Sequence, residues 1–211
     1  PDKFFGLGAV PLQDPDLAAK ELASVRDMGL QGVELLSNVR GENIGASQYR
    51  GFFKEVEKLG LAVFVHSQHP TFMDRFVGPE VLENALGFPI ESGLAAASVI
   101  TGGLLQECPN LRICFSHGGG VFGQLLPRME YIWHQRSAMR EALPEPPSES
   151  AKKLYYDDVF FETKTLRYLL DMVGTSQVMI GSDYPFFMRH LTPAKEFEEL
   201  GLNPMDIESI S

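Results

Sequence analysis

The feature that most constrains this chain is a repeated alternation of short apolar runs with longer amphipathic stretches. The runs are rich in Val, Ile and Phe, and their apolar residues mostly follow one another without alternating with polar ones. Strands buried on both faces have this pattern, which is typical of a parallel sheet covered by helices. The six runs are residues 4–11, 32–36, 61–66, 111–117, 159–162 and 177–183.

Helical segments separate these runs. The clearest one follows the first run, where Asp14 is a suitable N-cap, Pro15 suits the first helical position and Gly29 suits the end. Because parallel strands need crossover connections, we expect a chain of βα repeats. Further helices are expected at residues 47–59, 78–107, 121–143 and 165–172, and a surface loop at residues 144–150.

Two architectures use βα repeats, the doubly wound sheet and the (β/α)8 TIM barrel. Nucleotide-binding doubly wound sheets carry a glycine-rich loop after the first strand, but Gly6 and Gly8 form only a G-x-G here. We therefore predict an α/β protein of the barrel type. A complete barrel usually needs about 250 residues. We expect residues 1–211 to be a single domain that lacks the barrel's N-terminal strand or strands and part of its C-terminal end.

Charge, hydropathy and cysteine content indicate which partners this protein can bind and in which compartment it is found. The net charge of −10 argues against nucleic acid, because phosphate binding needs clustered Lys and Arg. The most apolar stretch, residues 93–105, is shorter than the roughly 20 residues that span a bilayer, so no membrane partner is expected. Cys108 and Cys114 are too few for a disulfide scaffold. We expect buried, reduced thiols in a cytoplasmic protein.

Three polar residues stand at the carboxyl ends of three separate runs: His66, His117 and Asp183. The carboxyl ends of parallel strands converge on one face of a barrel, where active sites form. Imidazole and carboxylate are the usual ligands of Zn²⁺ and also suit Mn²⁺ or Fe²⁺. Each residue alone has a plainer interpretation, as a packing histidine or as a capping aspartate. Their corresponding positions favour one shared site.

Three short segments strengthen the prediction of one shared site. FVHS at residues 64–67, CFSHGGG at 114–120 and IGSDYPF at 180–186 resemble signature segments of the amidohydrolase-related family. The resemblance extends from near residue 1 to about residue 193, and is strongest to the decarboxylase branch, which includes the aminocarboxymuconate-semialdehyde and resorcylate-type decarboxylases. It implies a metal-dependent barrel with a divalent metal, Zn²⁺ or alternatively Mn²⁺, and no organic cofactor.

The resemblance also implies roles for individual residues. His66 and Asp183 match metal ligands, and His117 matches the acid–base residue beside the metal, with Asp183 as a further candidate for moving a proton. Arg128 matches an arginine that pairs with a substrate carboxylate in a neighbouring subunit's site, which would require a homodimer or a larger homo-oligomer. The alternative interpretation of Arg128 is a surface arginine on a helix.

The glycines that follow His117 have a physical role of their own. Residues 118–120 are all glycine, and we expect them to let the backbone turn sharply and approach the site where a Cβ would obstruct it. Less specific expectations concern Glu162, as a carboxylate that either supports the site residues from behind or faces the substrate, and His190, as a loop residue that could line the pocket mouth. Phe186, Phe187 and Met188 are expected either in an apolar pocket wall or in the core.

The implied function is non-oxidative decarboxylation of a small unsaturated or aromatic carboxylic acid. One alternative is a metal-dependent hydrolase of an ester, lactone or amide, in which the metal activates water. Release of CO₂, as against an alcohol or amine, separates these two reactions. A third alternative is an inactive, truncated fragment, because the family's His-x-His ligand pair occurs nowhere in this sequence.

Overall fold

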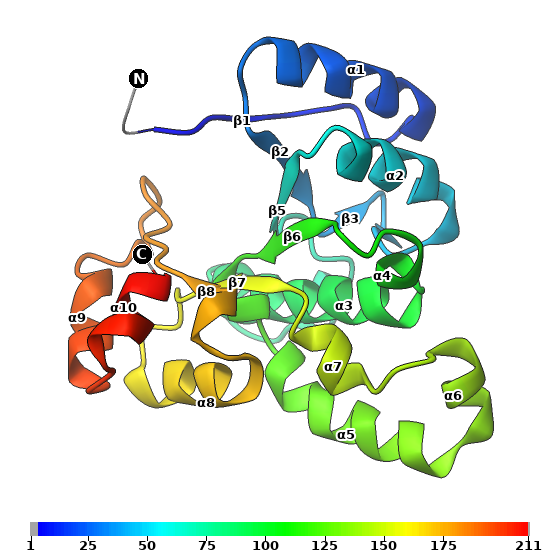
Figure 1. Ribbon diagram of the computed structural model, residues 1–211. Coiled ribbons are helices and arrows are strands. Elements are labelled where there is room, and N and C mark those ends of the chain that lie inside the picture. The colour runs from blue at the N-terminus through cyan, green and yellow to red at the C-terminus, as the bar shows by residue number, and fades with distance from the viewer. Residues whose placement is uncertain (1–3, 211) are drawn as a thin grey trace.

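The computed structural model describes residues 4–210, without the side chains of residues 193 and 194, so both ends of the expected 1–211 domain lie outside it. Six strands form one sheet in the order β1-β2-β5-β6-β7-β8, and every neighbouring pair is parallel (Figure 1). The strands are β1 (Leu7–Gly8), β2 (Gly32–Leu36), β5 (Ala62–His66), β6 (Arg112–Phe115), β7 (Tyr155–Asp157) and β8 (Val178–Met179). A separate antiparallel pair joins β3 (Asn38–Val39) to β4 (Glu42–Asn43).

The order of strands in the main sheet is also their order along the chain. Each crossover therefore carries the chain one strand further in the same direction. A doubly wound sheet would instead reverse direction at a switch point. The observed order is that of a (β/α)8 barrel, so the predicted fold class is confirmed, with six parallel strands among the described residues.

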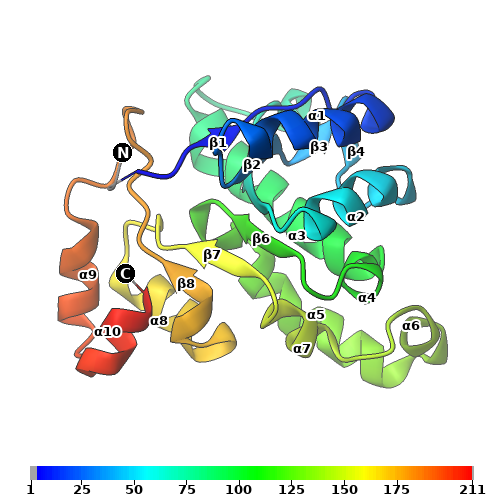
Figure 2. The ribbon, with the colours of Figure 1, turned by 45° about the horizontal axis from the view of Figure 1, so that its top comes forward.

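The helices lie along one side of the curved row of strands (Figure 2). The α-helices are α1 (Pro15–Asp27), α2 (Arg50–Lys58), α3 (Phe88–Thr101), α4 (Leu104–Glu107), α5 (Phe122–Gln135), α6 (Ser137–Ala142), α7 (Pro147–Ala151), α8 (Thr163–Val173), α9 (Pro193–Glu199) and α10 (Pro204–Ile210). The shorter turns are η1 (Ser47–Tyr49), η2 (Met73–Arg75), η3 (Glu83–Gly87), η4 (His117–Gly119) and η5 (Thr175–Gln177). Among the described residues, no helix has the length and hydropathy needed to cross a membrane.

Helix α1 shows how local signals and packing agree. The Asp14 side chain accepts a hydrogen bond from the backbone N–H of Leu17 at 3.0 Å, as expected of an N-cap. The helix buries Leu22 and Val25, and Gly29 follows it with a φ of +80°. Burial against the sheet and α2 therefore places this crossover where the sequence predicts it.

The sheet is buried on its helix side more than on its other side. In β2, Val33 and Leu35 are buried, whereas Glu34 and Leu36 are exposed. The expected burial on both faces is therefore wrong for β2, because helices cover only one face of this strand. Cys108 and Cys114 are both buried free thiols, as predicted.

Two predicted boundaries are wrong near the fifth strand. The strand lies at Tyr155–Asp157 and not at residues 159–162, because backbone pairing with β6 is made by Tyr155 and Tyr156. The apolar run that suggested a strand instead passes over the sheet's carboxyl edge. Part of the predicted loop at residues 144–150 forms the short helix α7, which buries Pro147 and Ala151.

Candidate active site

The three polar residues predicted at strand ends meet in space. His66 is the last residue of β5, His117 opens η4 two residues after β6, and Asp183 follows β8. His66 Nε2 lies 3.4 Å from Asp183 Oδ1, and His117 Nε2 lies 3.9 Å from Asp183 Oδ2. One ligand atom from each residue lies within 4.8 Å of the others. The predicted convergence of these three residues is therefore present.

The backbone at two of these residues is in the left-handed region. Both His117 and Asp183 have a φ of +55°. Residues with a side chain seldom adopt this conformation, and it persists only where the surrounding structure fixes it. It turns both side chains off the ends of their strands and toward His66.

The glycines after His117 allow the close approach that the sequence predicts. A Cβ on Gly118 would lie 1.7 Å from Phe160 Cζ, and one on Gly120 would lie 1.9 Å from the carbonyl oxygen of Pro89. Both glycines have a φ of +58°. Side chains are therefore excluded here by both backbone conformation and space.

Asp183 is the carboxylate of the cluster, and it lies within ion-pair distance of both histidines. The three side chains are only 11% to 16% exposed. Burial by itself would raise the pKa of Asp183, but His117 and, less strongly, His66 outweigh it and hold that pKa below its ordinary value. The carboxyl group is thus favoured in its ionised form, the form that binds a cation.

His66 provides a test of whether this cluster suits a metal ion. Both of its ring nitrogens are buried without a hydrogen-bond partner, the 3.4 Å approach to Asp183 being an ion-pair contact only. A buried polar nitrogen without a partner is costly, and a cation bound between His66 and Asp183 would satisfy one of them. The imidazole nitrogen of His66 and the carboxylate oxygen of Asp183 are donors of the kinds that Zn²⁺ and Mn²⁺ accept. The residues therefore fit a divalent ion.

Asp157 is a neighbour of the cluster that sequence reasoning missed. Its carboxylate accepts the backbone N–H groups of Gly118 at 2.9 Å and Val159 at 3.2 Å, and it is 5% exposed. Burial raises its pKa, against the opposing influence of nearby His117 and of these two N–H donors. Asp157 therefore anchors the glycine turn that carries His117. The available signal was the polar pair Asp157–Asp158 at the true end of β7.

A second missed residue is Glu91 in α3, which holds the segment after His66. Its carboxylate accepts the backbone N–H of Thr71 at 3.1 Å and the side-chain amide of Asn38 at 3.3 Å. The same Asn38 amide also donates to the carbonyl of His69 at 3.3 Å. Glu91 is 2% exposed, so this is a buried polar network that fixes the loop beyond β5. No local sequence pattern links residues so far apart.

The cluster lies in a cavity of about 450 Å³, within the usual range for small-molecule sites. Five phenylalanines form one part of its lining, called the aromatic wall below, and two of them, Phe186 and Phe187, were predicted to line it together with Met188. Phe186 also stacks on His66, with 6.1 Å between ring centroids. The other three phenylalanines of the aromatic wall are Phe88, Phe160 and Phe161.

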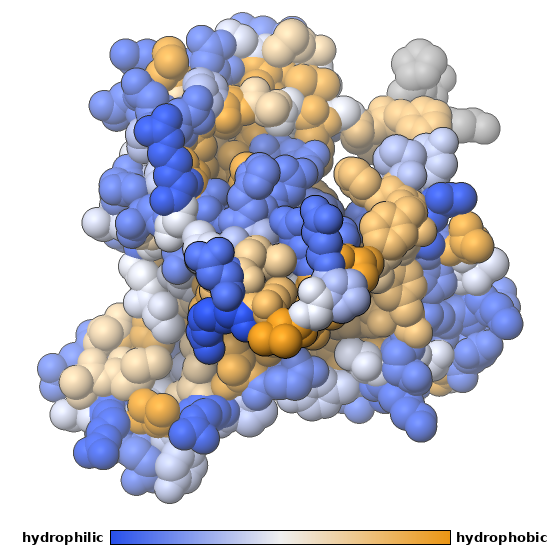
Figure 3. Space-filling model, turned by 180° about the vertical axis from the view of Figure 1, so that it is seen from behind, coloured by the Kyte–Doolittle hydropathy of each residue, from blue (hydrophilic) through white to orange (hydrophobic). Residues whose placement is uncertain are grey.

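The aromatic wall continues to the surface. Phe186 and Phe187 are 53% and 69% exposed, and Tyr184 beside them is 77% exposed. Figure 3 shows apolar areas, in orange, beside hydrophilic ones on the face opposite to that of Figure 1.

Three other candidates take different places. Glu162 is exposed, caps α8 by accepting the backbone N–H of Lys164 and lies outside the cavity lining, so it takes neither expected place at the site. His190 does not line this cavity but bonds to Glu196. Arg128 is exposed on α5, outside the cavity lining, and makes no ion pair within the described part of the chain.

Comparison with known proteins identifies the family that the chain resembles. The family model described as "Amidohydrolase" matches residues 1–204. The chain is 35% identical to the 2-amino-3-carboxymuconate-6-semialdehyde decarboxylase of Dictyostelium discoideum, over 95% of this chain and 56% of that protein. It is 31% identical to the gamma-resorcylate decarboxylase of Rhodococcus jostii, over 88% of this chain and 61% of that protein.

A solved structure extends the comparison of folds. The dihydroxybenzoic acid decarboxylase of Polaromonas, solved with bound manganese and the inhibitor 2-nitroresorcinol, superposes with a TM-score of 0.81 at 21% identity. The match covers 98% of this chain and 66% of that one. The chain thus spans about three fifths of the length of the curated relatives quoted above. Because the family model covers almost the whole sequence, the chain belongs to the amidohydrolase family.

Proposed function

We propose that this chain forms part of a metal-dependent decarboxylase that releases CO₂, without oxidation, from a small unsaturated or aromatic carboxylic acid. The observation that carries the proposal is the meeting of His66, His117 and Asp183 in a cavity with an aromatic wall. Support also comes from the two relatives above 30% identity, which bear the names of decarboxylases for two different acids of this kind.

His66 and Asp183 are the proposed ligands of a divalent ion, either Zn²⁺ or Mn²⁺. The partnerless nitrogens of His66 and the ionised state favoured for Asp183 support this assignment. When bound, such an ion supplies positive charge that holds a substrate carboxylate or an adjacent oxygen. The proposal includes no organic cofactor.

His117 is the proposed acid–base residue. When CO₂ leaves, its bonding electron pair stays on the substrate carbon, and that carbon must gain a proton. The imidazole of His117 lies in the cavity beside Asp183, with Nε2 3.9 Å from Oδ2, so a proton carried on Nε2 can be delivered to a carbon held there. The aromatic wall offers an apolar face against which a planar ring can lie next to these groups.

Arg128 is the proposed ligand of a second substrate carboxylate, contributed from one subunit to the site of another. A guanidinium can pair with a carboxylate through two hydrogen bonds. Exposure on α5, away from its own chain's cavity, supports a role in a neighbouring subunit. The proposal therefore includes a homodimer or a larger homo-oligomer.

The test measures CO₂ release by the Zn²⁺- or Mn²⁺-loaded chain from gamma-resorcylate and related aromatic acids. His117→Ala is expected to lower turnover by about 10²- to 10⁴-fold and to leave metal content nearly unchanged. His134→Ala is the matched control, because His134 is an exposed histidine of α5 that lies outside the cavity lining and contacts Glu130 and Trp133 of its own helix. Loss of metal from His117→Ala would contradict the acid–base role. Release of an alcohol or amine from esters or amides, without CO₂ from acids, would contradict decarboxylation.

A further inference from the structure

The loop of residues 183–190 is closed at its base by a contact outside the metal-binding cluster. The backbone N–H of His190 donates to the carbonyl oxygen of Ser182 at 2.7 Å, so the two ends of the loop meet. Between these ends the loop carries Phe186 and Phe187, which line the cavity. Whatever fixes His190 therefore also fixes this part of the aromatic wall.

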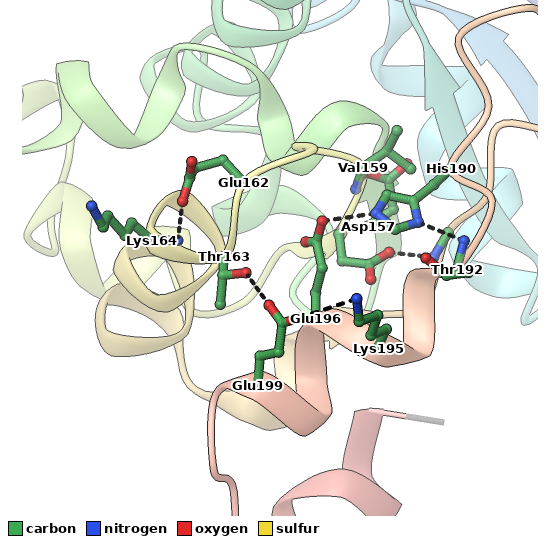
Figure 4. A network of polar contacts seen from close by, with 12 residues as sticks. Asp157, Val159, Glu162, Thr163, Lys164, His190, Thr192, Lys195, Glu196 and Glu199 are labelled. Carbon is green, nitrogen blue, oxygen red and sulfur yellow. Dashed lines mark hydrogen bonds and ion pairs between the residues drawn. The ribbon is translucent and has the colours of Figure 1, made fainter.

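The His190 ring is fixed by three contacts. Its Nε2 lies 2.8 Å from Glu196 Oε1, and its Nδ1 accepts the backbone N–H of Thr192 at 3.3 Å, as Figure 4 shows. Because an amide N–H can only donate, Nδ1 is an acceptor and the ring proton lies on Nε2, from which it is donated to Glu196. The ring also stacks on Phe161 with 5.7 Å between centroids and 7° between planes.

Glu196 is a firm anchor for this contact. The side chains of His190 and Glu196 are 9% and 13% exposed, so their hydrogen bond is largely shielded from water. Glu196 belongs to α9, and that helix is docked on the molecule by Phe197, which is 3% exposed in the core. On the same helix, Glu199 accepts a hydrogen bond from Thr163 of α8 at 3.3 Å.

Phe161 links the same anchor to a second part of the cavity lining. It lines the cavity that holds the metal-binding cluster, and it also lines a smaller cavity of about 280 Å³ beside His190 and Glu196. Its φ is +61°, a conformation that an aromatic residue seldom adopts without support from its surroundings. The stacked His190 ring supplies such support.

We propose that Glu196, acting through His190, is a positioning residue that fixes both the loop of residues 183–190 and Phe161. It thereby sets the shape of the cavity's aromatic wall. The consequence for substrate selection rests on the proposed function, whereas the positioning itself does not.

The test is hydrogen exchange of the intact chain, followed by mass spectrometry. Glu196→Ala is expected to speed exchange of amides in residues 184–190 by about tenfold, because the loop loses its anchor. Glu196→Gln, which keeps an acceptor oxygen, should stay within about twofold of wild type. Exchange in Glu199→Ala, the control on the same helix, should also stay within about twofold of wild type. Unchanged exchange in Glu196→Ala overturns the proposal, and so does an equal rise in residues 62–66 of β5.

Two further readouts separate this proposal from the proposed function. ¹⁵N NMR of the wild-type chain should show His190 as the neutral Nε2–H tautomer, and an Nδ1–H or doubly protonated ring overturns the proposal. With substrate, Glu196→Ala should raise KM by about tenfold and change kcat by less than about threefold, with Glu196→Gln restoring KM. A kcat loss without a KM change overturns the proposal. Absence of turnover in the wild type, with the expected exchange and tautomer, contradicts the proposed function alone.

Discussion

Gly120 marks the closest backbone approach beside the candidate site. A Cβ there would lie 1.9 Å from the carbonyl oxygen of Pro89, at a φ of +58°. A backbone carbonyl cannot move aside as a flexible side chain can. Gly120→Ala is therefore expected to lower the free energy of unfolding by about 3 kcal/mol or more, as measured by urea denaturation.

Gly51 provides the matched control for this substitution. It lies in α2, is exposed, and has open space where a Cβ would stand. Gly51→Ala is expected to raise the free energy of unfolding by about 0.5–1 kcal/mol. Equal effects of the two alanines would show that the approach of Gly120 to Pro89 is not rigid.

Asp158 is a buried carboxyl that should make stability depend on pH. It accepts the backbone N–H of Gly181 through Oδ1, while its Oδ2 is buried without a partner. Burial, reinforced by nearby Asp157, raises its pKa from 3.8 to about 6 against the opposing Gly181 N–H. Below about pH 4 both the folded and unfolded states hold the proton. Between about pH 4 and 6 only the folded state holds it, so stability is lost as pH rises through this window.

Asp158→Asn should remove the loss of stability that accompanies deprotonation of Asp158. The free energy of unfolding of this variant relative to wild type is expected to rise by about 2–3 kcal/mol between pH 4 and pH 7. Asp171→Asn, which changes an exposed carboxyl of α8, is the control for the rest of the chain. A difference between Asp158→Asn and wild type that does not vary with pH would contradict the raised pKa.

The site residues that could be predicted from the sequence are those that a neighbouring sequence pattern marks. His66, His117 and Asp183 each follow an apolar run directly, and convergence of strand ends then brings them together. Asp157 and Glu91 were not predictable in this way. Their roles depend on backbone groups far away in the sequence, such as Gly118 and Thr71, and no spacing rule encodes such contacts.

At the scale of elements, predicted and observed bounds agree best where the apolar run and the residues that end it predict the same boundary. The strands β2 and β5 lie at or within one residue of their predicted bounds, since apolar runs end there at polar residues or glycine. β7 was misplaced because Tyr155 and Tyr156 look less apolar than the following Val159–Phe161 segment, although the tyrosines make the pairing with β6. Tertiary pairing here outweighed local hydropathy.

The N-cap of α1 allows a prediction at this scale. Asp14 satisfies the otherwise unpaired N–H of Leu17. Asp14→Ala is expected to lower the free energy of unfolding by about 1 kcal/mol, whereas Asp16→Ala in the first turn should cost less than about half as much. Thermal unfolding of the two variants provides the measurement. A smaller loss in Asp14→Ala than in Asp16→Ala would contradict the capping role.

For the whole molecule, the strand order decides the architecture. The residue pattern favoured a barrel over a doubly wound sheet because a glycine-rich phosphate loop was lacking, and the family resemblance implied a barrel as well. The all-parallel order β1-β2-β5-β6-β7-β8 supplies the topological reason. Local sequence patterns do not show whether a surface residue contributes to the site of a neighbouring subunit.

Arg128 tests that question directly. If it acts in a partner's site, chains carrying Arg128→Ala and chains carrying His117→Ala are each nearly inactive. Random mixing into dimers then yields hybrids with one intact site, so activity should recover to about a quarter of wild type. No recovery after subunit exchange would place Arg128 in the site of its own chain or outside any site.

The most direct test of this account is the metal content of the chain after stripping and reloading with Zn²⁺ or Mn²⁺. The account predicts about one ion per chain in the wild type and in the His134→Ala control. It predicts no bound ion in the His66→Ala, Asp183→Ala double variant, because both proposed ligands are gone. Absence of a bound ion from the wild type, or its retention in the double variant, would contradict the metal site on which the proposed decarboxylation depends.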